Sequence, residues 1–452
     1  MPIGRRVSRR AALATTVLLL CALTLVLGYL NKARCAGPPF GADGRSAVFD
    51  IAKDTEVCYS DIQFLWLGRD IDNHVFPYIH GAITPDGALI GGVVEYPVLS
   101  GVLMWLGAIP AQTDADFLRW SALLLAPFAL LTAWMLARMA GAAALLWAIG
   151  TPLLLYAFHN WELPVVCTAV AAVYVVTVPR WSLRTRGVVA AVLLGLGFCL
   201  KLYPGIFVLP LMAYVLTGGT GGKRDLRGAL LTGAAAAGTV LLVNLPFALA
   251  GFEGWRASFA FQQLRRADIT TNSLWYWGLR PLYPASSAGE ERFQDAVSLA
   301  SPALILAAFA LALWLGWRRA RTTGVYPWVG VSGAMLCGFL LFHKVHSPQY
   351  TLWLVPFLVL LVVPWPLVGA YLVADVAIGV GVFRYFAALG TGDGVEPLEN
   401  VVQFGVWGRA VLLAVFFVLF LRAAVRDDLA TSAPPATAFP SRTPRPAPAG
   451  PR

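Results

Sequence analysis

The acidic side chain best suited to chemistry is Asp61, within residues 59–66 (YSDIQFLW). Aromatic and aliphatic neighbours partly desolvate such a carboxylate, which raises its pKa toward the range of a useful general base. The segment is amphipathic and would hold Asp61 at a membrane surface, where an amphiphilic substrate presents its headgroup. The alternative is structural, with Asp61 as the N-cap of a helix that begins at Ile62.

Lys201 is the only charged residue between Gly187 and Thr217. A lone cation in an apolar stretch usually lines a cavity or pairs with an anion, and a phosphate would be a natural partner. The alternative is a lysine whose ammonium reaches the lipid headgroups.

A denser basic cluster consists of His343, Lys344 and His346, and a further cation, Arg265, follows an apolar run. Together they could offset the charge on a departing phosphate, to which arginine gives bidentate contacts. The two histidines could also suit zinc, but no third ligand converges with them, so we predict neither a metal site nor a cofactor. Capping at the end of a span is the alternative role for this cluster.

The sequence His159-Asn160-Trp161-Glu162 falls at a turn between two apolar runs. Its histidine and carboxylate are three residues apart, so they could share a helical face and bind sugar hydroxyls. The alternative is interfacial capping, with Trp161 as a belt aromatic at the headgroup level.

The elements that position these residues lie in lipid. Hydrophobic residues form 58% of the 452-residue chain and the mean hydropathy is +0.69, which leaves too little charged surface for a soluble globule. The net charge of +10 comes from basic clusters between apolar runs rather than from one soluble face, so we predict no nucleic-acid partner. The sequence therefore predicts an all-α polytopic protein of the plasma membrane.

The basic clusters define a topology when they are placed in the cytoplasm. About twelve spans then result, with both termini cytoplasmic and residues 11–30 as an uncleaved signal anchor. Residues 1–428 form one membrane domain, and residues 429–452 form a disordered cytoplasmic tail. Two large loops, residues 31–118 and 251–297, lie outside. The predicted spans are residues 11–30, 120–137, 142–158, 163–178, 187–200, 203–217, 229–250, 298–317, 325–342, 350–363, 367–387 and 402–421.

Two features of the first loop stay open at this point. Residues 93–110 are apolar, and we place them on the outer interface because a further span would move Arg180, Arg184 and Arg186 outside; a true span with inverted topology is the alternative. Cys35 and Cys58 share this loop and either form a disulfide or remain two unpaired thiols.

Residues 187–217 are predicted to form a hairpin of two spans. Its turn, near Lys201, is recessed below the outer surface.

Asp61, Lys201, Arg265 and Lys344 all fall on the outer side of this topology. With that arrangement the chain resembles the GT-C glycosyltransferases, and specifically the actinobacterial mannosyltransferases of glycosyltransferase family 87. The likeness is architectural over most of the chain. It is motif-level at five short segments: Tyr59-Ser60-Asp61, Glu95-Tyr96-Pro97, His159-Asn160-Trp161-Glu162, Leu200-Lys201-Leu202-Tyr203-Pro204 and His346-Ser347-Pro348-Gln349-Tyr350.

The resemblance implies an inverting transfer of mannose from a polyprenyl-phosphate donor to an envelope glycolipid or polysaccharide. It implies that Asp61 is the catalytic base, and that the donor phosphate is bound by Lys201, Arg265, His343, Lys344 and His346. Residues implied to bind the sugar or the acceptor are Glu95, Tyr96, His159, Asn160, Glu162 and Gln349. No Asp-x-Asp pair occurs at Asp61, because Tyr59 takes the other position, so a metal-bridged phosphate is not expected.

Two other classes of function compete with a transferase. A transporter or flippase of lipid-linked sugars would need a pathway open alternately to both sides, and such carriers often show internal repeats and broken helices at the midplane. No repeat is visible here, and the polar residues cluster at one rim. A noncatalytic scaffold for envelope assembly would instead tolerate alanine at both Asp61 and Lys201.

Overall fold

The computed structural model describes residues 2–426, with side chains from Arg9 onward. Seventeen α-helices make up most of this part of the chain. A short antiparallel sheet in the first loop, β1 (Ala82–Ile83) with β2 (Leu89–Ile90), is the only sheet among the described residues. The predicted all-α polytopic class is therefore confirmed. The predicted disordered tail, residues 429–452, lies outside the described residues.

Eight helical segments are long and apolar enough to cross a membrane, judged by length and composition within the described chain. They comprise α1 (Pro2–Ala33), α5 (Asp114–Ala140) with its continuation to Ile149, α9 (Leu183–Leu200), η2 (Tyr203–Phe207) with α10 (Val208–Leu216), α11 (Leu226–Ala250), α13 (Ser287–Thr323), α16 (Trp365–Thr391) and α17 (Val395–Arg422). Shorter apolar segments are α4 (Val98–Ala108), α8 (Glu162–Val176), α14 (Trp328–Phe342) and η7 (Pro348–Tyr350) with α15 (Thr351–Leu360).

The expected count of about twelve spans is higher than this, and the shorter segments explain the difference. All ten residues of α15 are buried in the protein, so this helix is surrounded by other helices rather than by lipid. The run predicted as one span over residues 142–158 is broken into η1 (Gly141–Ala144), α6 (Leu145–Ile149) and α7 (Thr151–Tyr156). The break comes from extended backbone at Gly150, two residues before Pro152.

The apolar segment at residues 93–110 folds as α4, which has 11 residues. At 1.5 Å per residue this helix is about 16 Å long, roughly half of the ~30 Å hydrocarbon core. It begins after Pro97 and packs against α5 and α9. Helix α4 is thus too short to span and covers the helices of the bundle instead.

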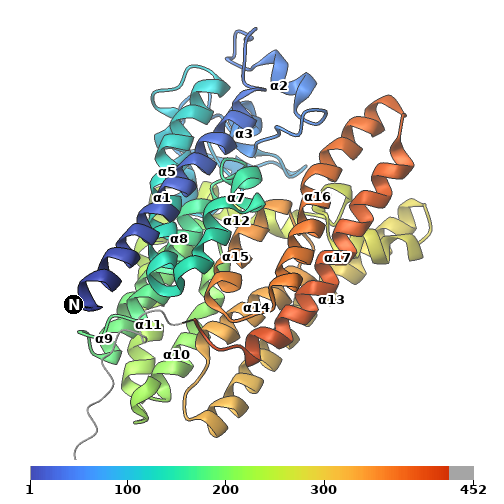
Figure 1. The fold of residues 1–452 in the computed structure, drawn as a ribbon. Helices are drawn as coiled ribbons and strands as arrows, with labels where there is room; N and C mark the ends of the chain where they lie inside the picture. The colour runs from blue at the N-terminus through green and yellow to red at the C-terminus, as the bar shows by residue number, and fades with distance from the viewer. Residues whose placement is uncertain (1, 427–452) are drawn as a thin grey trace, which may run out of the picture.

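The basic connectors meet at one end of the bundle. Arg184, in the first turn of α9, donates two hydrogen bonds to the carboxylate of Asp225, the N-cap of α11, at 2.6 and 2.8 Å. Arg319, near the end of α13, donates to the Leu421 carbonyl of α17 at 2.6 Å. The N-terminus lies at the end of the molecule opposite α2 (Ala47–Ala52) and α3 (Asp61–Gly68) (Figure 1). The first loop and the basic connectors therefore occupy different ends.

Cys35 and Cys58 form a disulfide within the first large loop, with Cα atoms 6.2 Å apart. The structure thus decides between the disulfide and the two unpaired thiols that the sequence left open.

The second large loop packs against the first. It contains α12 (Phe252–Leu264), η4 (Ile269–Thr271), η5 (Trp275–Leu279) and η6 (Arg280–Leu282). A Cβ atom at Gly254 would lie 2.0 Å from the Tyr78 carbonyl oxygen, so glycine is needed where α12 meets the first loop.

Candidate active site

A cavity of about 620 Å³ lies between the two large loops and the ends of the helices. Its size falls within the usual range for small-molecule sites, roughly 300–1,000 Å³. Most of the predicted site residues line it: Asp61, Glu95, Tyr96, His159, Asn160, Lys201, Arg265, His343 and Gln349. Glu162, Lys344 and His346 are not among its lining residues.

Asp61 is the first residue of α3 and is partly buried in the cavity wall. Its Oδ1 accepts a hydrogen bond from the Tyr59 hydroxyl and its Oδ2 accepts one from the Asn160 amide, both at 2.7 Å. The N-cap of this helix is Ser60, whose Oγ accepts from the Ile62 N–H at 3.2 Å. The alternative that made Asp61 the cap is therefore wrong, and its carboxylate is directed to other partners.

Asn160 connects Asp61 to the rest of the first loop. Its Nδ2 also donates to the Tyr96 hydroxyl at 2.7 Å, and its Oδ1 accepts from the Trp161 N–H at 2.6 Å. The Asp61 N–H in turn donates to the His159 carbonyl at 2.8 Å. Asn160 is thus occupied in orienting Asp61 and Tyr96, rather than being free to bind a sugar as the resemblance implied.

Burial raises the pKa of Asp61 above its ordinary value, and the hydrogen bonds from Tyr59 and Asn160 oppose this only in part. The nearby Glu95 carboxylate also favours the protonated form. Glu95 itself pairs with Arg69, whose Nε lies 2.7 Å from Oε2. A carboxylate held in place with a raised pKa meets the two requirements for a general base, which are reach and basicity.

Lys201 follows α9 and extends into the cavity wall rather than to the lipid headgroups. Its ammonium forms an ion pair with Glu162 Oε1 and lies 5.1–5.3 Å from the ring centroids of Tyr96, Tyr350 and Trp353. The alternative of a snorkelling lysine is therefore wrong. The cation is already balanced by a carboxylate and by three aromatic faces.

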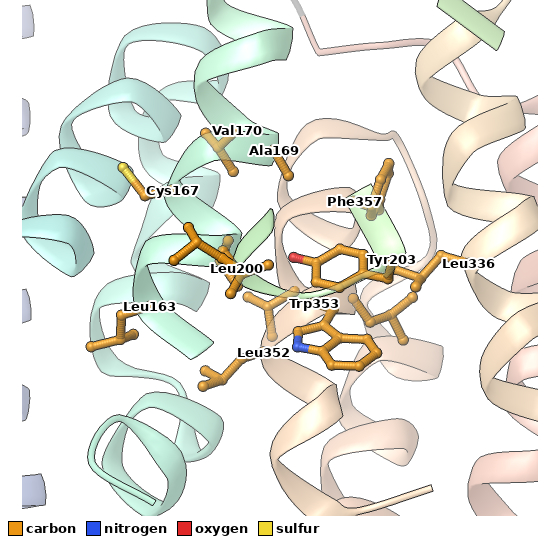
Figure 2. Close-up of a cluster of buried hydrophobic side chains, with 14 of the residues drawn as sticks. Leu163, Cys167, Ala169, Val170, Leu200, Tyr203, Leu336, Leu352, Trp353 and Phe357 are labelled. Atoms are coloured by element: carbon orange, nitrogen blue, oxygen red, sulfur yellow. The ribbon is translucent and has the colours of Figure 1, made fainter. Parts of the chain in front are cut away.

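Glu162 has no exposed surface, and its second oxygen accepts from the Trp353 indole N–H at 2.6 Å. Both of its oxygens are thus used to hold Lys201 and Trp353, so the implied role in sugar binding does not fit its position. Beneath this pair, Trp353 stacks on Tyr203 with ring centroids 4.3 Å apart (Figure 2). Apolar side chains of α8 and α15, including Ala169 and Phe357, lie beside the stacked rings.

Arg265 follows α12 and lines the cavity with a partly exposed side chain. Within residues 9–426, no ion pair or side-chain hydrogen bond involves its guanidinium. Its neighbour Lys344 donates to the Gln263 carbonyl at 3.2 Å and lies outside the cavity lining. Arg265 is therefore the basic side chain of the cavity best placed to receive an anionic ligand.

The two histidines do not supply the positive charge that the sequence suggested. Burial lowers the pKa of His343 to about 4, so its ring is neutral near pH 7, where it stacks on Phe339 at 4.6 Å. His346 is buried behind the cavity wall, and burial holds its pKa well below the ordinary value. The backbone N–H of His346 donates to the Thr271 carbonyl at 2.7 Å, which joins the segment between α14 and α15 to the second large loop.

An ion pair that our sequence reasoning missed lies behind this wall. Asp375 of α16 and Arg409 of α17 have no exposed surface, and their charged atoms are 3.6 Å apart. Arg409 also donates to the His346 carbonyl at 3.2 Å, and Asp375 accepts from the Thr351 hydroxyl. The signal was available, since a charged residue within a predicted span marks a buried partner or a functional element. The pair supports the segment that carries Gln349.

Among the described residues, no group of three or more His, Cys, Asp or Glu side chains could hold a metal ion.

The family model described as Mannosyltransferase (PIG-M) matches residues 165–383, slightly less than half of the chain. The matched segment contains Lys201, Arg265 and Gln349 but not Asp61. No curated protein matches the chain.

Among solved structures, the chain is similar to a crystal structure of ArnT from Cupriavidus metallidurans bound to undecaprenyl phosphate. The sequence identity is 16% and the TM-score is 0.41, and the match covers 90% of this chain and 78% of that chain.

The Asp375–Arg409 pair gives a prediction about stability. Arg409→Met leaves the Asp375 carboxylate buried without its cation, so we expect a loss of about 3–5 kcal/mol, measured as a lower thermal midpoint in detergent. Arg409→Met combined with Asp375→Asn removes both charges and their desolvation cost, so most of the stability should return. A double variant no more stable than Arg409→Met would show that the two charges do not stabilise each other.

Proposed function

We propose that the protein is a GT-C glycosyltransferase that transfers a sugar, mannose, from a polyprenyl-phosphate donor to an envelope glycolipid or polysaccharide. The observation that carries this proposal is that one cavity contains both an oriented carboxylate, Asp61, and a guanidinium, Arg265, that pairs with no side chain of residues 9–426. The apolar helices of the bundle would place this cavity within reach of an isoprenoid lipid. The match to a mannosyltransferase family model supports the sugar and the reaction class.

The reaction that fits this geometry is a direct displacement. An Asp61 oxygen removes the proton from an acceptor hydroxyl, and the hydroxyl oxygen attacks the anomeric carbon of the donor. The bond between that carbon and the phosphate oxygen breaks, and the polyprenyl phosphate leaves with the bonding electrons. Attack from the face opposite the leaving group inverts the anomeric configuration. Asp61 ends protonated and returns its proton to water.

The phosphate group that leaves would be held mainly by Arg265. Its guanidinium can form two parallel hydrogen bonds with phosphate oxygens and has no competing carboxylate among the described residues. Lys201 would assist through its remaining N–H donors, and its pairing with Glu162 fixes its position. Preorganised donors aimed at developing charge are usually the largest contribution to such transfers.

The site lies in loops that we propose to be outside the cytoplasm, with both termini inside and no metal required. The support for this sidedness is that Arg184, in the first turn of α9, and Arg319, near the end of α13, lie at the end of the bundle with the N-terminus, away from α3. Basic connectors favour the cytoplasmic side. Membership of glycosyltransferase family 87 belongs to the same proposal.

The test of the function is transfer of labelled mannose from a polyprenyl-phosphate donor to membrane glycolipids by purified protein. Asp61→Asn and Asp61→Ala should each lower kcat by roughly 10²–10⁴-fold, because general-base catalysis is lost. Asp86→Asn, an exposed aspartate of the same loop, is the control and should keep the wild-type rate. Near-wild-type rates in both Asp61 variants, or movement of lipid-linked sugar across vesicles without any transfer, would exclude the proposed reaction.

Arg265 and Arg266 offer a matched pair for the phosphate site. Arg265→Gln should raise KM for the donor and lower kcat/KM by about 10- to 100-fold, because a charge-assisted contact to phosphate is worth roughly 1.5–3 kcal/mol. Arg266 is exposed and does not line the cavity, so Arg266→Gln should change kcat/KM less than twofold. Equal effects of the two substitutions would indicate a general electrostatic role for this loop rather than a phosphate site at Arg265.

The pH dependence of kcat/KM tests Asp61 independently. The base must be ionised, so activity should fall as the pH drops through the raised pKa of Asp61, above the ordinary aspartate value of about 4. Tyr59→Phe removes a hydrogen bond that favours the carboxylate, so the acid limb should move to higher pH. Tyr385→Phe, outside the cavity lining, is the control. An acid limb that stays in place in Tyr59→Phe would argue against Asp61 as the titrating base.

A further inference from the structure

The C-terminal end of α1 lies beside α3 and contacts the segment that leads into it (Figure 1). Lys32, in the last turn of α1, is 3% exposed, and its ammonium donates a hydrogen bond to the Tyr59 carbonyl at 2.7 Å. We propose that Lys32 is a positioning residue for the transfer, whose buried charge keeps the Asp61 carboxylate ionised and in place. The inference rests on the proposed function and concerns a residue outside the cavity lining.

The end of α1 and residues 58–61 are joined at two points. Cys35, three residues after Lys32, forms the disulfide with Cys58, which directly precedes Tyr59. The Tyr59 carbonyl accepts from Lys32, and the Tyr59 hydroxyl donates to Asp61 Oδ1 at 2.7 Å. The residue that Lys32 holds by its backbone therefore holds the acid by its side chain.

The turn before α8 encloses Lys32 from another side. Ser60 Oγ donates to the Phe158 carbonyl of this turn at 2.7 Å. The Phe158 ring in turn contacts the Tyr29 ring edge to face, with centroids 6.4 Å apart, and Tyr29 lies on α1 three residues before Lys32. Lys32 is thus buried where α1, the first loop and this turn meet, and does not extend to the lipid headgroups.

The Lys32 ammonium forms no ion pair in the part of the chain that the structure describes, where its one hydrogen bond is to a neutral carbonyl. A buried cation is costly unless negative charge lies nearby. Among the charged groups around it, the Asp61 carboxylate acts most strongly on Lys32. The attraction between two charges is mutual, so Lys32 favours the ionised form of Asp61 and opposes the effect of burial.

Other titratable groups face the same region. Glu95 favours protonation of Asp61, whereas the Lys201 charge favours its ionisation. Burial, followed by the Lys32 and Lys201 charges, lowers the pKa of His159 well below its ordinary value, so this ring is neutral. Because burial is the largest of these causes, His159 should stay neutral when the Lys32 charge is removed. The change should therefore be seen in the titration of Asp61.

The test follows the ionisation of Asp61 in purified full-length protein in detergent. Dicyclohexylcarbodiimide reacts with a protonated carboxyl group, so mass spectrometry of Asp61 modification over a series of pH values reports its titration without any sugar transfer. Lys32→Met and Lys32→Gln both remove the charge, and modification should persist to a pH higher by at least about half a unit. Lys32→Gln keeps an N–H donor for the Tyr59 carbonyl, so an equal shift in both variants identifies the charge as the cause.

The acid limb of kcat/KM for mannose transfer should move to higher pH by the same amount in both Lys32 variants. Activity above the limb should stay within about threefold of the wild-type value, because the base is ionised there. Arg34→Met is the matched control, since Arg34 is at the same end of α1 but is half-exposed and paired with Glu56. Solvent screens its charge, so neither curve should shift by more than about 0.2 units.

The role of Lys32 would be overturned by an unchanged modification curve in both Lys32 variants, by a shift in Lys32→Met alone, or by an equal shift in Arg34→Met. A uniform loss of activity at every pH with an unchanged modification curve would likewise overturn it, because it would show that Lys32 only supports the fold. Failure of the proposed function is seen separately, as a protein whose Asp61 modification shifts as expected but that transfers no sugar.

Discussion

The hydrogen bonds to the Asp61 carboxylate are the interaction on which the candidate site depends. A carboxylate lined by aromatic rings is costly unless donors satisfy its oxygens, and Tyr59 and Asn160 supply one donor each. Tyr59 also stacks on Phe383 of α16, with ring centroids 5.4 Å apart. The same few side chains therefore fix the acid, the first loop and a long helix relative to one another.

The distribution of charge around the cavity follows from the low dielectric of a membrane protein. Glu95 is neutralised by Arg69, and Glu162 by Lys201, because an isolated charge in such surroundings is unfavourable. These pairs shape the cavity, but the two charges within each pair neutralise one another, so neither pair presents a net charge to a ligand. Asp61, satisfied by uncharged donors, and Arg265, which has no anionic partner in the described part of the chain, remain as groups of opposite sign. In the proposed displacement, Asp61 would accept the proton of the acceptor hydroxyl and Arg265 would bind the departing phosphate.

The sequence predicted the class of fold and which residues would share one end of the molecule. Charge clusters and apolar runs depend on local composition, so the helices containing residues 163–178, 187–200 and 367–387 were located closely. The positions of the basic clusters predicted that Asp61, Lys201 and Arg265 lie on the same side of the membrane. In the structure all three line one cavity. Breaks such as that at Gly150 were missed because hydropathy does not register backbone conformation.

Partner choice could not be predicted, because it depends on contacts between residues distant in sequence. Glu162 resembled a sugar ligand beside His159, yet it lies 39 residues before the lysine that it neutralises. His343 and His346 looked cationic, but burial makes both rings neutral.

The proposed reaction requires that a single cavity bring the Asp61 carboxylate to the anomeric carbon of a lipid-linked sugar. The most direct measurement is a cryo-EM structure of the Asp61→Asn protein with polyprenyl-phosphate mannose bound. We expect the donor phosphate on the Arg265 guanidinium, and the anomeric carbon facing residue 61 across a gap that one acceptor hydroxyl can fill. A donor phosphate bound away from Arg265, or a sugar that turns its anomeric carbon away from residue 61, would contradict it.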